Sequence, residues 1–423
     1  MTPAMAIPQF EPLRRSNPQF GERSREPAPG HGVPRLVPPL QPAPAHAHDR
    51  LPLLDALRGF AILLMTLDHC AALGRINVIA EHYVGRLTVL PSWPYLVVGL
   101  LTNLAAPMFW VMSGMSIAFL GRRLEQGRGT DPSLASYLIT RAGILLLIDT
   151  MVVSFLWAPT LNIKHVYCFD LLSSLAVSMV LLVLLRRLPQ LPQRTVGRIG
   201  TIGWVGLAML VAYPLIWAIA PQSWRTSGGF WLAAWTQYSG GAHPVVSFPV
   251  LAWGGLLMIG YAFGTRLELP EWQGVRRWCV IGASLMGAWL LVRMLGGYGN
   301  IVPWHKSDGW LALVIMSKGP PGLDFMTFNL GLASFAIAAF IFWREQIEKH
   351  GWLMDLGRAS LCVYVAHLVI YKGLAWAGLG ILPGDAGLRY LVTWISGLAL
   401  LIPVARWWRG LKERHREGML RYL

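Results

Sequence analysis

The sequence is dominated by long apolar stretches that begin near residue 51 and recur almost to its end. A helix needs about 20 predominantly apolar residues to cross a hydrocarbon core of about 30 Å. Backbone polar groups in lipid must bond within their own segment, so such stretches are helical. We count ten of them, at residues 53–73, 95–120, 136–157, 168–185, 200–220, 246–264, 278–295, 325–343, 358–376 and 388–406. The sequence therefore predicts an all-α polytopic integral membrane protein, a bundle of about ten transmembrane helices.

The composition supports this fold class and limits the partners. Only 13% of the residues are charged, whereas soluble proteins carry about 25%. A net charge of +15 could indicate nucleic-acid binding, but membrane proteins gather Lys and Arg in cytoplasmic loops. We therefore expect no nucleic-acid partner. The four cysteines show no metal-ligand spacing, so we expect no metal site.

The distribution of basic residues predicts the orientation. With ten crossings, 25 of the 36 Lys and Arg residues fall on the side that holds both termini, and nine fall on the other side. Cytoplasmic loops are enriched in these residues, so both termini are expected in the cytoplasm.

The two ends of the chain differ from the apolar part. Residues 1–50 are rich in Pro and Ala and poor in aromatic residues. Such a segment cannot bury enough apolar surface to offset its chain entropy. We expect a disordered cytoplasmic tail over residues 1–50, a transmembrane domain over 51–408 and a basic cytoplasmic tail over 409–423.

The first apolar stretch, "LDALRGFAILLMTLDH", carries four ionisable residues: Asp55, Arg58, Asp68 and His69. At about 100° per residue, Arg58 and His69 share one face and lie about 16 Å apart along the helix. Asp68 points about 100° away from His69. One alternative is that Asp55 and Arg58 form an ion pair with no further role. Likewise, His69 could be a packed core residue with no role in catalysis. Charges inside a membrane are nevertheless costly and usually functional.

Other predicted helices add polar groups. Arg141 begins the third helix from the cytoplasmic side, and Asn103 lies in the second beside Pro107. Tyr364 and His367 share a face of the ninth helix. A histidine titrates near neutral pH and is the usual proton carrier, so these histidines are candidates for acid–base chemistry.

Five ordered blocks of the sequence resemble one family. "LPLLDALRGFAILLMTLDH" and "TNLAAPMFWVMSGMSIAFL" look like the first two helices of the bacterial membrane family related to heparan-α-glucosaminide N-acetyltransferase. "WGGLLMIGYAFG", "SKGPPGLDFMTFNLG" and "LGRASLCVYVAHLVI" are similar to three later blocks. The resemblance spans about residues 50–405.

The resemblance implies acyl transfer across a membrane, in the bacterial inner membrane. The donor would be cytoplasmic acetyl-CoA or another acyl-CoA, and the acceptor an amine or hydroxyl of a glycan or glycolipid on the outer side. Besides these molecules we expect contact with membrane lipid, and the sequence is compatible with a homodimer.

The residues can be assigned to this reaction by their predicted depth. Cations near cytoplasmic helix ends can hold the donor's phosphates, which selects Arg58, Arg141 and Arg358, with Asp55 beside them. The CoA arm would pass along the face from Arg58 to His69. His69 would act as base or acyl carrier, with Asp68 next to it, and Asn103 would donate to the oxyanion. His82 is a second catalytic candidate because the animal relative has a histidine near that spacing. The candidates for binding the acceptor are Lys318, Tyr364 and His367.

Two other classes remain open. Gly and Pro in the helices, with charges in the bundle, are compatible with a transporter or a flippase of a lipid or sugar conjugate. A non-catalytic membrane scaffold is the third alternative. Binding of CoA, or cleavage of its thioester, is expected only for the acyltransferase.

Overall fold

The apolar stretches are helical in the structure, which is a computed structural model. It describes residues 52–74, 93–125, 133–157, 168–188, 200–221, 230–236, 245–264, 266, 272–379, 385–415 and 419–423. The segment predicted to be disordered, residues 1–50, lies outside the described residues, and so does His82. The predicted domain limits stay predictions.

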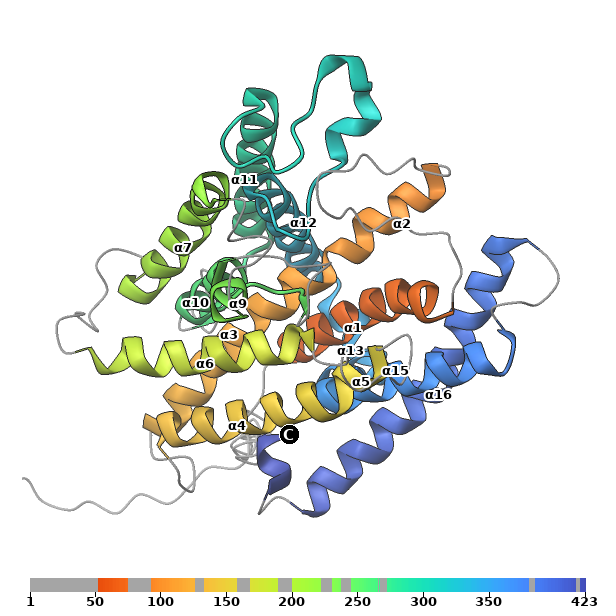
Figure 1. The fold of residues 1–423 in the computed structure, drawn as a ribbon. Helices are drawn as coiled ribbons and strands as arrows, with labels where there is room; N and C mark the ends of the chain where they lie inside the picture. Colours follow the sequence, from red (N-terminus) through yellow and green to blue (C-terminus); the bar gives the residue numbers. More distant parts are fainter. Residues whose placement is uncertain are drawn as a thin grey trace, which may run out of the picture. The chain divides into compact units, whose positions relative to one another are not determined.

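The described part of the first half of the chain consists of helices and one very short strand (Figure 1). Its elements are α1 (Pro52–Leu73), α2 (Trp93–Asn103), α3 (Ala105–Glu125), α4 (Leu134–Ile148), the π-helix η1 (Asp149–Val153), α5 (Ser154–Trp157), β1 (Cys168–Phe169), α6 (Leu171–Arg187), α7 (Gly200–Ile219) and α9 (Phe230–Thr236).

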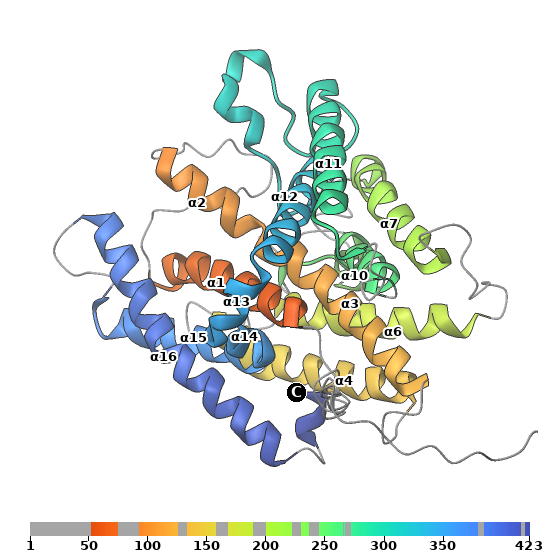
Figure 2. The ribbon, with the colours of Figure 1, turned by 180° about the vertical axis from the view of Figure 1, so that it is seen from behind.

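The second half adds a strand that pairs with the first in parallel, with Cys168 opposite Val245. The view from behind shows the later helices clearly (Figure 2). The elements are β2 (Val245–Val246), α10 (Val250–Gly264), α11 (Val275–Leu295), the 3₁₀-helices η4 (Lys306–Asp308) and η5 (Trp310–Val314), α12 (Leu323–Phe342), α13 (Arg344–Lys349), α14 (Gly351–Arg358), α15 (Ser360–Trp376), α16 (Ala386–Arg414) and the 3₁₀-helix η7 (Met419–Tyr422).

The prediction of an all-α membrane protein is confirmed, but the ten crossings are not. Among the described residues, seven helical segments are long and apolar enough to cross a membrane. An eighth is counted if α14 and α15, bent by 93° at their junction, form one span. Two predicted spans are shorter than 18 residues: α6 has 17 and α10 has 15. The number of crossings and the side of the termini therefore stay predictions.

Helix α1 lies inside the bundle, where it contacts α3, α14, α15 and α16. More than half of the apolar segments of α1, α2–α3 and α12 is buried, whereas α4, α7, α11 and α16 bury a third or less. The outer faces of these four helices carry large exposed apolar side chains such as Leu147, Ile219, Leu291 and Leu400. Such faces suit contact with lipid, where polar groups would be costly.

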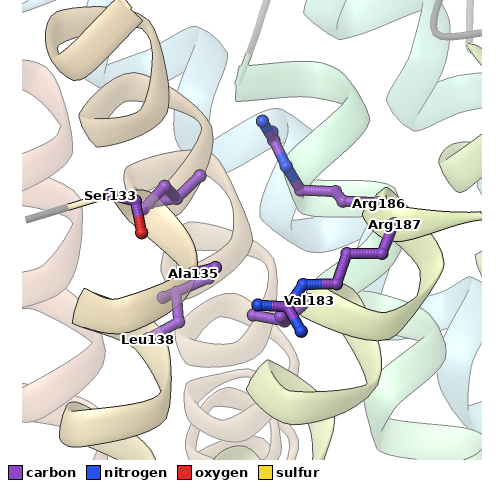
Figure 3. A pocket seen from close by; sticks show the side chains of 7 residues that line it. Ser133, Ala135, Leu138, Val183, Arg186 and Arg187 are labelled. Carbon is purple, nitrogen blue, oxygen red and sulfur yellow. The ribbon is translucent and has the colours of Figure 1, made fainter.

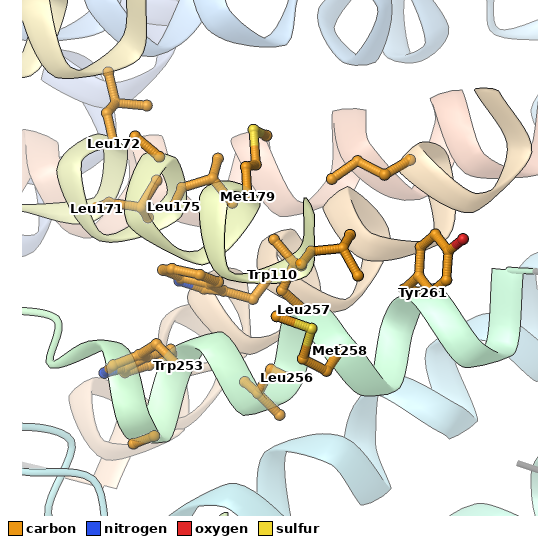
Figure 4. Close-up of a cluster of buried hydrophobic side chains, with 14 of the residues drawn as sticks. Trp110, Leu171, Leu172, Leu175, Met179, Trp253, Leu256, Leu257, Met258 and Tyr261 are labelled. Atoms are coloured by element: carbon orange, nitrogen blue, oxygen red, sulfur yellow. The ribbon is translucent and has the colours of Figure 1, made fainter. Parts of the chain in front are cut away.

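Helices α3 and α10 pack closely against each other at glycine residues. A Cβ at Gly114 would overlap the carbonyl oxygen of Leu257, and a Cβ at Gly260 would overlap that of Val111. Small residues let membrane helices approach this closely. Beside this contact, Trp110 and Trp253 join a buried apolar cluster that also includes residues of α6 (Figure 4).

The same kind of contact joins α1 to α14. A Cβ at Gly59 would overlap the carbonyl oxygen of Leu353, and a Cβ at Gly357 would overlap that of Asp55. Ile62, further along α1, is buried in a cluster with Leu356 and Val363. The bent pair α14–α15 therefore follows one face of α1 and brings its own polar residues to both ends of that face.

Candidate functional site

A pair of histidines joins α1 to α15. The Nδ1 atom of His69 lies 2.7 Å from the Nε2 atom of His367, and the two rings stack with centroids 5.0 Å apart. His367 is fully buried, and the side chain of His69 is 19% exposed. Both residues were predicted as candidates, but their direct contact was not.

The hydrogen bonds assign the protons of the neutral pair. The Nδ1 atom of His367 lies 3.2 Å from the carbonyl oxygen of Val363, which can only accept, so Nδ1 carries the proton. The Nε2 atom of His367 then accepts from Nδ1–H of His69. This leaves Nε2 of His69 without a proton, and that atom can accept one from a substrate.

Three groups surround the ring of His69. Trp157 packs against it edge to face, with ring centroids 4.9 Å apart. An oxygen of Asp68 lies 3.8 Å from Nε2 of His69, although a helix points the two side chains about 100° apart. The charge of Lys318 is also near enough to act on His69. Lys318 lies in the turn before α12, which closes through a bridge between Lys318 and Pro321.

Tyr364 lies beside His367. Its ring centroid is 5.5 Å from that of His367, as their common helix face predicts. The structure therefore brings together His69, Asp68, Lys318, Tyr364 and His367, which had been assigned separately to catalysis and acceptor binding.

A second polar cluster lies at the start of α1. Asp55 accepts from Nε of Arg358 at 3.0 Å, and Arg58 lies 3.9 Å from the same carboxylate. Arg58 also donates to the hydroxyl of Ser116 on α3. The prediction that Asp55, Arg58 and Arg358 lie together is consistent with this geometry.

The face of α1 between the two polar clusters does not form the predicted path for the CoA arm. The sequence suggested that the CoA arm runs along α1 from Arg58 to His69. Instead, Ile62 on this face is 2% exposed and packed against α14 and α15. This face of α1 is in contact with α14 and α15, because the glycines at the start of α1 and the end of α14 let these helices approach closely.

Arg141 takes part in a different contact. It lies on α4 and donates to the carbonyl oxygen of Tyr422 at 2.8 Å and to the hydroxyl of Tyr137 at 3.3 Å. These described bonds tie α4 to the segment around Tyr422 and do not link Arg141 to Arg58.

Asn103 is the last residue of α2, directly before the break at Leu104. It is 3% exposed, and its Oδ1 atom has no hydrogen-bond partner among the described residues. A buried polar atom without a partner is costly and calls for a ligand or a water molecule. The assignment of Asn103 to the oxyanion stays a prediction.

A pocket of about 220 Å³ lies between the start of α4 and the end of α6. Arg186 and Arg187 approach it from α6, and Ser133 lies on the opposite wall (Figure 3). Along α6 this end is about 24 Å from Asp170, which begins the helix. The pocket is therefore remote from the histidine pair and adds cations at the end of the bundle that is predicted to be cytoplasmic.

Residues 50–296 match the family model described as heparan-alpha-glucosaminide N-acetyltransferase, catalytic. The match covers more than half of the chain. The chain belongs to this family. No curated protein matches it.

The family match includes only part of the candidate site. It contains Asp55, Arg58, Asp68 and His69, whereas Lys318, Arg358, Tyr364 and His367 lie beyond residue 296. The fold joins the two parts, because α14 and α15 pack on α1. In this family member the residues after the matched region therefore complete both clusters.

Two acidic residues near Tyr364 were not predicted as site residues. Asp149 begins the π-helix η1 and is fully buried, and Asp170 precedes α6 and is 8% exposed. Both act electrostatically on Tyr364. Asp149 lies within the apolar stretch at residues 136–157, where an acidic residue is unusual. No local pattern indicates that Asp170, 21 residues later, lies beside it.

A buried arginine organises the segment that carries Lys318. Arg293, near the end of the apolar stretch at residues 278–295, is 1% exposed. It donates to the carbonyl oxygens of Val302, Ala312, Leu313 and Ile315. Its NH1 atom is also 3.3 Å from Asp324. Arg293 thereby fixes the chain between α11 and α12, the segment that carries Lys318.

Proposed function

We propose that this member of the heparan-alpha-glucosaminide N-acetyltransferase family moves an acyl group, foremost acetyl, from cytoplasmic acyl-CoA to an acceptor. The acceptor is an amine or hydroxyl group of a glycan or glycolipid on the outer side of a bacterial inner membrane. The observation that carries the proposal is the histidine pair, which leaves Nε2 of His69 able to take a proton inside a membrane protein of this family.

The cluster at the start of α1 suits the donor. Acyl-CoA is an anionic phosphate body on a long thioester arm. Arg58 and Arg358 share the single carboxylate of Asp55, so these three side chains together carry one net positive charge. Guanidinium groups bind phosphate well, because they are planar and offer several donors. Arg186 and Arg187, at the pocket between α4 and α6, would add to the positive potential on the same side.

The histidine pair suits the transfer step. His69 takes the proton from the acceptor nitrogen or oxygen, which then attacks the thioester carbon. Asn103 donates to the oxyanion that forms there. The C–S bond breaks, the new C–N or C–O bond forms, and the CoA thiolate receives the proton. A route through acyl-histidine would use the same Nε2 atom as the nucleophile.

Substitution of His69 tests the assignment. We expect His69→Gln to lower the release of CoA thiol from acetyl-CoA at least ~10²-fold, measured with membrane lipids and glycans as acceptors. CoA affinity and folding should stay near those of the wild type, because glutamine keeps a polar side chain. Near-native turnover by folded His69→Gln protein would refute this role and move the chemistry to His82.

The orientation can be tested separately. Reporter fusions after Arg187 and after Arg225 should report opposite sides of the membrane, because α7 lies between these positions. The same side for both would remove the proposed separation of donor and acceptor.

One observation favours a transporter as the second candidate. The 93° bend between α14 and α15 is a broken helix directly after Arg358, the partner of Asp55, and transporters bind substrate at such breaks. Purified protein that moves a glycolipid across liposomes without consuming acetyl-CoA would favour this alternative.

A further inference from the structure

Helix α6 is capped by a residue from another helix. The Oδ2 atom of Asp149 accepts from the backbone N–H of Asp170 at 3.2 Å and from that of Ser173 at 2.9 Å. These N–H groups are unsatisfied at a helix start, and normally the N-cap side chain takes one of them. The N-cap of α6 is Asp170, whose own side chain makes no capping bond. Asp149 therefore performs the capping that Asp170 would otherwise provide.

The carboxylate of Asp170 serves a different neighbour. The hydroxyl of Tyr364 lies within hydrogen-bonding reach of it. The ring of Tyr364 packs on His367, whose Nε2 atom bonds to His69. A continuous chain of contacts thus runs from the carboxylate of Asp170, at the N-cap of α6, through α15 to His69 on α1.

We propose that Asp170 and Tyr364 are positioning residues that stabilise the cation formed on the histidine pair during transfer. A phenol that donates to a carboxylate has a more electron-rich ring, and an electron-rich ring attracts a cation within about 6 Å of its centroid. The ring contact between Tyr364 and His367 is within this range. This inference rests on the proposed function, because the cation arises when His69 accepts a proton.

The proton balance defines where the charge lies. In direct transfer, Nε2 of His69 gains the acceptor's proton while Nδ1 of His69 passes its proton to Nε2 of His367. His367 then carries protons on both nitrogens, with Nδ1–H held by the carbonyl oxygen of Val363. The positive charge sits beside Tyr364. When the CoA thiolate leaves, the protons move back along the same path, and the thiolate is released as a thiol.

Several ionisable groups face the pair and bear on its response to pH. Asp68 on α1 lies next to His69, and the charge of Lys318, in the turn before α12, acts on His69 electrostatically. Tyr364 lies next to His367 on α15, and Asp149, Cys168 and Asp170 face Tyr364. Asp68 and Lys318 oppose one another in charge, whereas the carboxylates beyond Tyr364 favour a cation on His367.

Labelling of His69 as a function of pH tests the proposal without turnover. Diethyl pyrocarbonate acylates an imidazole only at a ring nitrogen that carries no proton, which in the neutral pair is Nε2 of His69, and mass spectrometry of the peptide reads the extent at His69. Removal of the negative charge in Asp170→Asn should make the pair harder to protonate. The midpoint of labelling should therefore move to lower pH by about half a unit or more. Tyr364→Phe should move it in the same direction, and the double variant no further than the larger single effect.

Ser247→Ala is the matched control. Its hydroxyl lies 3.6 Å from the Sγ atom of Cys168, in the same region, but it carries no charge. Its labelling midpoint should equal that of the wild type. An unchanged midpoint in folded Asp170→Asn would overturn the proposal. If Asp170→Asn does not fold, Tyr364→Phe is the deciding variant, since it removes only a hydroxyl, and an unchanged labelling midpoint in this variant overturns the proposal. Wild-type protein that labels normally but releases no CoA would refute the proposed function and leave the coupling of Asp170 to the pair intact.

Discussion

Gly357 lies directly against the backbone carbonyl of Asp55, with no room for a Cβ between α14 and α1. The next residue, Arg358, binds the carboxylate of the same aspartate at 3.0 Å. The sequence "LGR" therefore has two linked functions. Its glycine permits the closest approach of two helices, and its arginine uses that approach to reach the polar start of α1.

Gly357→Ala should destabilise the protein and weaken the Asp55–Arg358 pair, because the added methyl forces α14 away from α1. Overpacking of this kind costs about 1–3 kcal/mol. Thermal unfolding followed by the exposure of buried thiols such as Cys70 measures the loss. Gly351→Ala, on the same helix, is the control, since a Cβ there meets nothing within 4 Å. Equal melting temperatures for both variants would argue against the close contact.

Arg358→Ala and Arg58→Ala should each weaken acetyl-CoA binding. A charge-assisted contact contributes roughly 1.5–3 kcal/mol, or about 10- to 150-fold in Kd. Isothermal titration with purified protein gives the affinities. Arg344→Ala is the control, because Arg344 is exposed and pairs with Glu348 on its own helix.

Arg141→Ala extends this comparison. Since its guanidinium holds Tyr422, we expect a smaller effect on CoA affinity than from Arg58→Ala. A loss as large as that of Arg58→Ala would mean that the donor's phosphates reach α4. Unchanged affinity in all three variants would exclude a donor site at the start of α1.

Arg293→Met should strongly destabilise the protein, because it leaves the carboxylate of Asp324 buried without its cation. Removing one partner of a buried ion pair costs about 3–5 kcal/mol. Arg293→Met/Asp324→Asn should recover part of this loss, since the unpaired charge is then absent. Arg344→Met is an exposed control. The measurement is the unfolding curve of the wild type, Arg293→Met, the double variant and Arg344→Met. If Arg293→Met is as stable as the double variant, the buried carboxylate of Asp324 does not need Arg293 as its partner.

Helical periodicity explains which parts of the site could be predicted. The common face of Arg58 and His69, and that of Tyr364 and His367, follow from spacing along single helices. The contact between His69 and His367 joins positions 298 residues apart, and that between Asp55 and Arg358 joins positions 303 apart. Such contacts depend on how helices pack. No local pattern specifies them.

Other differences between the predicted and the observed site have local structural causes that the sequence pattern does not indicate. Asp149 begins the π-helix Asp149–Val153 and accepts from the start of α6, and regular helical spacing predicts neither feature. Arg293 lies near the end of an apolar stretch, from which a long basic side chain normally reaches the membrane surface. Its burial depends on four carbonyl groups from a segment without regular apolar spacing.

A single alanine inserted after Leu63 tests the register of α1 as a whole. The insertion would rotate His69 by about 100° and shift it by about 1.5 Å relative to Arg58. The start of α1 is fixed by Gly59, Asp55 and the contacts of α14, so the rotation must appear at the other end. The 2.7 Å contact between His69 and His367 would then be lost. We expect CoA-thiol release to fall at least ~10²-fold, with CoA affinity retained at the opposite end of the helix. The same alanine inserted after Leu73 follows His69 and should leave both properties near the wild type. Native turnover by the first variant would show that catalysis does not require the registered histidine pair.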